Sequence, residues 1–220
     1  MSLDLTPPLS TPPQRLDLSF VSLPVGSLLH RVYDMQHTAT EFNPGYQGNA
    51  RFSPIQRSPD RPVPTLYAGS SRDCALMETV FHDVPYLPGY KTLDLARLDM
   101  KSHTILALQH TLQLVDLRSI ALHKLGISRA ELIDCEKAHY PRTRAWAQAI
   151  YQQCPQAQGL LWTSRRDDSA QAYMLFGDRV PADALRVASD SLSLRHHLPT
   201  WEAVLALAER LGVCLAPGQG

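Results

Sequence analysis

Hydrophobic and polar residues alternate in several short segments of the chain. Alternation with a period of two is typical of a strand that buries one face. It predicts a strand over residues 25–33, and short, mainly apolar segments predict further strands over residues 65–68, 104–108, 113–117, 159–163 and 172–176.

Capping residues and residues that end helices predict four helices between these strands. The helices are expected from a cap at Ser70 or Ser71 to about residue 82, from a capping box at Ser128 to about residue 137, from Tyr140 and Pro141 onward, and from a cap at Thr200 to Gly212. Strands and helices do not alternate regularly, so the pattern favours an α+β fold over a parallel α/β fold.

The 220 residues fit one domain with an extension at its start. Residues 1–24 carry five prolines and are expected to form an extended arm. Residues 25–220 are expected to form a single domain. Its irregular stretch over residues 41–64, rich in Gly, Pro and Asn, has the length at which loops are usually functional or disordered.

Charge and composition exclude several classes of protein. Lys plus Arg and Asp plus Glu both number 21, so the net charge is zero, which argues against direct nucleic-acid binding. It leaves room for a local cationic pocket and for self-association. No apolar run approaches the ~20 residues of a membrane span, no secretory signal is evident, and the four cysteines are scattered. We therefore expect a cytoplasmic protein with reduced thiols.

The common catalytic motifs GxGxxG, GxxxxGK[ST], HExxH and GxSxG do not occur, and the nine histidines lack metal-ligand spacing. No metal is expected. Glu78 stands out because its helical neighbours Cys74, Ala75 and Phe81 are apolar. It lies either at the rim of the core or inside a pocket, where an ionised carboxylate needs a partner.

Arg31 and Arg51 each allow a structural interpretation and a ligand-binding interpretation. Arg31 lies in an apolar strand and either reaches the surface or forms a fork for a phosphate or carboxylate. Arg51 follows a loop rich in small residues, which is either a plain surface loop or one that lets the backbone approach a ligand. Ser164 follows a hydrophobic strand, and Arg165 to Asp168 are expected to form a solvated turn.

Taken together, three segments resemble the RES-domain family of bacterial toxins. They are LHRVY at 29–33; GNARFSP at 48–54 followed by TLYAGS at 65–70 and ALME at 75–78; and GLLWTSR at 159–165 followed by MLF at 174–176. The family's name refers to an Arg, a Glu and a Ser, which would be Arg31, Glu78 and Ser164 here. Ala50 stands where the family usually has Gly, and Ser53 where Asn is commoner.

The resemblance implies an ADP-ribosyltransferase-like fold, a mixed sheet flanked by helices, that binds NAD+ in a cleft. It further implies cleavage of the nicotinamide–ribose bond by an NAD+ phosphorylase or glycohydrolase, with inorganic phosphate as a candidate co-substrate. Glu78 would stabilise the cationic ribose carbon. Ser164 would contact the nicotinamide side or orient Glu78. Arg31 and Arg51 would bind the pyrophosphate, with Tyr46 and Tyr67 as stacking or ribose contacts.

The resemblance also implies a partner, an antitoxin of the Xre helix-turn-helix type that covers the cleft. Homo-oligomers and hetero-oligomers with the antitoxin are both expected. Two alternative functions remain: a mono-ADP-ribosyltransferase that modifies a protein, and a non-catalytic module that binds a nucleotide or a partner. The sequence leaves the acceptor, the stoichiometry and the trigger for release open.

Overall fold

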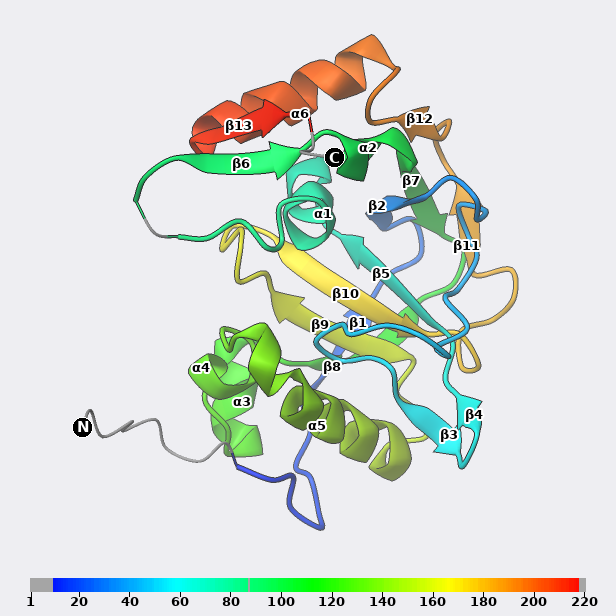
Figure 1. The fold of residues 1–220 in the computed structure, drawn as a ribbon. Helices are drawn as coiled ribbons and strands as arrows, with labels where there is room; N and C mark the ends of the chain where they lie inside the picture. The colour runs from blue at the N-terminus through cyan, green and yellow to red at the C-terminus, as the bar shows by residue number, and fades with distance from the viewer. Residues whose placement is uncertain (1–9, 87, 218–220) are drawn as a thin grey trace, which may run out of the picture.

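A curled, nine-stranded mixed sheet forms the centre of the protein (Figure 1). The computed structural model describes residues 10–86 and 88–217. In sheet order the strands are β1 (Phe20–Leu23), β8 (Leu112–Asp116), β9 (Gly159–Thr163), β10 (Gln171–Phe176), β5 (Thr65–Gly69), β2 (Leu28–Asp34), β7 (Lys101–Leu108) and β11 (Leu185–Val187), with β12 (Leu192–Ser193) also paired to β7. Strands β8 and β9 run parallel, and the other neighbours run antiparallel. The expected α+β class is confirmed.

The alternation along each strand divides its side chains between two cores. On β10, Met174 and Phe176 pack in one hydrophobic cluster, whereas Tyr173 and Leu175 pack in another. The second cluster gathers Leu29, Leu66 and Leu106 from neighbouring strands on the sheet's inner face. These strands are buried on both faces, so helices must cover the outer one.

Two groups of helices do so, and Figure 1 shows them at opposite ends of the view. One group comprises α1 (Arg72–Thr79), α2 (Ala96–Asp99) and α6 (Leu198–Arg210). The other comprises α3 (Ser119–Leu125), α4 (Arg129–Leu132), the 3₁₀ turn η1 (Lys137–His139) and α5 (Tyr140–Gln153). Two small sheets complete the fold: β3 (Gln56–Ser58) with β4 (Arg61–Pro62), and β6 (Lys91–Asp94) parallel to β13 (Val213–Ala216). Among the described residues, no helix has both the length and the apolar character of a membrane span.

Three helix boundaries differ from the sequence-based expectation. Helix α1 is capped by Ser71 as expected but ends at Thr79, short of residue 82. The capping box at Ser128 is present, yet α4 spans one turn and the chain re-enters a helix only at η1. The last helix starts at Leu198 rather than after Thr200, because Pro199 fits the first helical turn and His197 takes the cap position.

The segment rich in proline contributes to the sheet. Within it, β1 pairs with β8, and the Ser10 carbonyl accepts a 2.8 Å hydrogen bond from the Trp146 indole N–H. Residues 1–9 lie outside the described residues. The division into an arm over residues 1–24 and a domain over residues 25–220 stays a prediction.

The sheet opens between β2 and β5. These strands pair at a single position, His30 with Gly69, and Asn43 bridges Thr65 farther along the edge of β5. Helix α1 begins just after β5 and packs its buried face against Val32 of β2, so it crosses the opening. Gly69 is required at this crossing, because a Cβ there would lie 2.9 Å from the Ala75 nitrogen.

Candidate active site

A cleft follows the opening between β2 and β5. It consists of a pocket of about 480 Å³ lined by Arg31 and a pocket of about 390 Å³ lined by Arg51 and Glu78. Val32 and Tyr67 line both pockets, so the two are neighbours. Each volume lies in the range of small-molecule sites.

Glu78 and Ser164 meet at the wall of the second pocket. Glu78 lies in the last turn of α1, and Ser164 is fully buried directly after β9. The Ser164 hydroxyl donates a 2.5 Å hydrogen bond to Glu78 Oε1. Ser164 Oγ accepts bonds from the backbone N–H groups of Arg166 at 3.0 Å and Asp167 at 3.1 Å. This bond is the contact expected if Ser164 orients Glu78, and the role of Ser164 towards nicotinamide stays a prediction.

Arg31 is buried rather than extended to the surface. Its guanidinium donates to the backbone carbonyls of Ala39 at 2.5 Å and Glu41 at 2.7 Å, and it lies 5.3 Å from the Tyr33 ring. Burial lowers the pKa of Arg31 to about 10, against the opposing effects of Tyr33 and Glu41. A guanidinium has five N–H donors, of which these bonds use two. Arg31 therefore fixes the loop at one end of the cleft while lining the pocket itself.

Arg51 is also buried, so the plain surface-loop alternative is wrong for it. It donates to the Cys135 carbonyl at 3.3 Å and to the Tyr140 hydroxyl at 3.4 Å, and it lies 5.0 Å from the centre of the Tyr140 ring. The Thr143 hydroxyl bonds to the Arg51 carbonyl. These contacts tie the loop before β3 to the start of α5 and place a fixed positive charge in the pocket wall.

The two tyrosines differ in their surroundings. Tyr67 lies between the pockets, and its hydroxyl donates a 3.0 Å bond to Ser53 Oγ. Burial raises the pKa of Tyr67 well above its usual value, so its hydroxyl stays protonated. Tyr46 lines the first pocket with 75% of its surface exposed, and its ring is free to contact a ligand.

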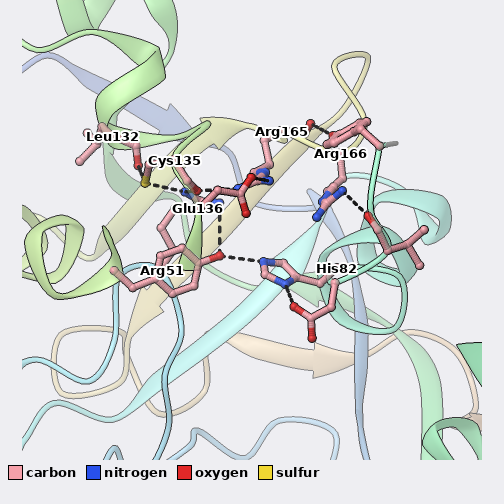
Figure 2. Close-up of polar contacts among 11 residues, drawn as sticks. Arg51, His82, Leu132, Cys135, Glu136, Arg165 and Arg166 are labelled. Atoms are coloured by element: carbon pink, nitrogen blue, oxygen red, sulfur yellow. Dashed lines mark hydrogen bonds and ion pairs between the residues drawn. The ribbon is translucent and has the colours of Figure 1, made fainter. Parts of the chain in front are cut away.

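The expected solvated turn at Arg165 and Arg166 is wrong. The Arg165 side chain is 6% exposed and donates to the Cys135 carbonyl at 2.5 Å and to Glu136 at 3.0 Å (Figure 2). Arg166 donates to the Val84 carbonyl at 2.8 Å. These bonds connect the turn after β9 to the segments before η1 and after α1, and the carbonyls there supply the acceptors that solvent was expected to provide.

Sequence reasoning missed His82 and Tyr140, which line the same pocket as Glu78. The Tyr140 hydroxyl lies 2.9 Å from His82 Nε2, and His82 Nδ1 lies 2.9 Å from Asp83 Oδ1. The available signal was the four-residue spacing from Glu78 to His82, which in a helix reaching about residue 82 would put both on one face, although α1 ends at Thr79. Tyr140 gave no signal beyond its position at a helix start.

No group of His, Cys, Asp or Glu in the described part of the chain has metal-site geometry. The cysteines are unpaired thiols: Cys74, Cys135 and Cys154 are buried, and Cys214 is exposed. Burial, with the Glu78 and Asp167 charges, raises the pKa of Cys74 to about 12. A thiol with that pKa is a poor nucleophile.

A chain of the M. tuberculosis MbcT–MbcA toxin–antitoxin complex has a similar fold, with a TM-score of 0.57 and 13% sequence identity. The similarity covers 87% of this chain and 91% of that one. A comparison with curated proteins finds no significant match. The family model of the RES domain matches residues 28–200, which hold Arg31, Arg51, Glu78 and Ser164. The chain belongs to the RES-domain family.

Proposed function

We propose that this protein is the toxin of a toxin–antitoxin pair and that it cleaves NAD+ at the nicotinamide–ribose bond. The observation that carries the proposal is the Glu78 carboxylate, held by Ser164 in the wall of a cleft that also contains two buried arginines. Family membership and the fold shared with a chain of a toxin–antitoxin complex support the toxin assignment.

The charges of the cleft suit a dinucleotide. A pyrophosphate carries two negative charges, and a planar guanidinium matches its oxygens. Arg31 has N–H donors beyond its two carbonyl bonds, while Arg51 acts mainly through its charge because its bonds go to Cys135 and Tyr140. Tyr46 and Tyr67 offer ring faces for the base or ribose.

The chemistry follows from the position of Glu78. When the C1′–N bond breaks, nicotinamide leaves as a neutral molecule with the electron pair, and positive charge develops on the ribose. A fixed carboxylate stabilises that charge more in the transition state than in the substrate. The Ser164 hydrogen bond fixes the orientation of Glu78, so no reorganisation is needed during the reaction.

The direct test is product analysis after incubating pure protein with NAD+. Free nicotinamide with ADP-ribose would indicate water as the acceptor. ADP-ribose 1-phosphate in phosphate buffer would indicate phosphorolysis, and label from NAD+ on a protein would indicate the mono-ADP-ribosyltransferase alternative. Intact NAD+ under all conditions would reject the enzyme and leave a binding module.

The toxin assignment has its own test in bacteria. Expression of the wild type should lower NAD+ and arrest growth, while the Glu78→Gln variant should do neither. Co-expression of the product of the adjacent gene, which we propose is an antitoxin of the Xre helix-turn-helix type, should restore growth by covering the cleft. Growth and NAD+ unchanged by the wild type would contradict the toxin assignment.

A further inference from the structure

A chain of hydrogen bonds leads away from the pocket that holds Glu78. Tyr140 Oη lies 2.9 Å from His82 Nε2, and His82 Nδ1 lies 2.9 Å from Asp83 Oδ1. Figure 2 shows both contacts of the His82 ring, one on each nitrogen. The Tyr140 side chain is buried and His82 is 22% exposed, whereas Asp83 is 47% exposed, so the chain runs from the pocket towards solvent.

The partners fix the direction of each bond. An ionised carboxylate only accepts, so His82 Nδ1 carries the proton that faces Asp83. In a neutral imidazole Nε2 is then an acceptor, and the Tyr140 O–H donates to it. A hydroxyl oxygen has two lone pairs. One accepts from Arg51 Nη2 at 3.4 Å, and the other remains to accept from a molecule in the pocket.

We infer that Tyr140, His82 and Asp83 form a proton relay that activates a water molecule as the acceptor of the ADP-ribosyl group. The inference rests on the proposed NAD+ cleavage and assigns the step after it. Tyr140 is the group that touches the water, and His82 and Asp83 act through Tyr140. Glu78 remains assigned to the ribose cation, so the two parts of the pocket have separate tasks.

In this step, attack of water on C1′ is coupled to proton transfer along the relay. The water oxygen bonds to C1′ as the C1′–N bond breaks and nicotinamide leaves with that electron pair. The water proton moves to Tyr140 Oη while the phenol proton moves to His82 Nε2. Asp83 stabilises the resulting imidazolium, which returns its proton to solvent. The products are ADP-ribose, nicotinamide and one proton.

Several charged groups surround the His82 ring. Besides bonding to His82, Asp83 lies 3.5 Å from Arg97 Nη2 of α2. Burial raises the pKa of Tyr140, so its hydroxyl keeps its proton until the transfer. The charged and titratable side chains that line the pockets with His82 are Glu78 within α1, Asp83 and Tyr86 after it, Glu136 and Lys137 near η1, Tyr140 of α5, Arg51 of the loop before β3, Tyr67 of β5, and Arg165 and Arg166 after β9.

The test compares His82→Gln, Tyr140→Phe and wild type in phosphate-free buffer across pH. If the relay operates, wild-type turnover should fall towards acid pH, because an imidazolium cannot accept the phenol proton. His82→Gln should lose about a hundredfold or more in kcat, keep KM, and lose that acid limb. Tyr140→Phe keeps the ring beside Arg51 and should show the same loss. His110→Gln removes a His–Asp pair of 3.0 Å on the surface and should behave as wild type.

A retained acid limb in either folded variant would overturn the relay, because a structural role lowers the rate without changing the shape of the pH profile. Wild-type turnover that requires phosphate would also overturn it, since the phosphate dianion can attack without losing a proton, but would leave NAD+ cleavage standing. Wild-type protein that leaves NAD+ intact in both buffers would remove both proposals.

Discussion

The Ser164 hydroxyl donates to the Glu78 carboxylate at 2.5 Å while accepting from two backbone N–H groups of the following turn. The two residues lie 86 positions apart in the chain, at the end of α1 and the end of β9. The bond therefore depends on the sheet that carries both elements. A short bond to an ionised acceptor is strong and fixes the carboxylate orientation.

Glu78→Gln should lower NAD+ turnover about a hundredfold or more, because the amide keeps the shape and one acceptor but loses the negative charge. The midpoint of thermal unfolding should barely change. Product formation by chromatography and a thermal melt measure the two effects. Glu202→Gln, an exposed residue on α6, is the control. A Glu78→Gln variant as active as wild type would contradict the assignment.

Ser164→Ala should lower both turnover and stability. The Arg166 and Asp167 N–H groups lose their acceptor at a fully buried position, which costs about 1–3 kcal/mol in the free energy of unfolding. Denaturant unfolding measures this cost, and its absence would show that the turn finds other acceptors. Glu78→Gln is expected to lower turnover without lowering stability. Comparing the two variants therefore separates the role of Ser164 in supporting the turn from its role in the reaction.

Arg31→Lys should fold but bind NAD+ about 10–100-fold more weakly, which corresponds to the loss of a charged hydrogen bond. Lysine keeps the charge but cannot span the Ala39 and Glu41 carbonyls and a ligand together. Calorimetric titration of the Glu78→Gln background avoids turnover during the measurement. Arg61→Lys on the exposed β4 is the control. Equal affinity would show that Arg31 only holds the loop.

Stability should fall as pH drops from about 6.5 towards 4. Burial, aided by the His30 and Arg72 charges, lowers the pKa of His103 to about 4 from 6.5. In this window the unfolded chain binds a proton that the native protein does not, so acid favours unfolding, by up to about 3 kcal/mol. His103→Gln should flatten the dependence, measured by urea unfolding at several pH values. His110→Gln, an exposed histidine, should leave it unchanged.

The central strands were largely predictable because they are short apolar runs bounded by polar turn residues, as on β10. Short elements such as β6 and β13 were missed, since β6 in the middle of the chain is paired with β13, far along the sequence. At the site, Glu78 and Arg31 stood out because charged residues interrupt apolar patterns. His82 and Tyr140 did not, since they stand out only through their mutual contact, and they lie 58 positions apart in the sequence.

The single pairing of β2 with β5 divides the sheet into two parts that share few backbone hydrogen bonds. Regions joined by few buried contacts separate at low free-energy cost, and amide hydrogen exchange reports such local opening. A ligand in the cleft touches both parts through Val32 and Tyr67, so binding opposes their separation. The cleft thus follows the line where the two parts of the sheet share a single paired position, and a molecule bound there would hold the two parts together.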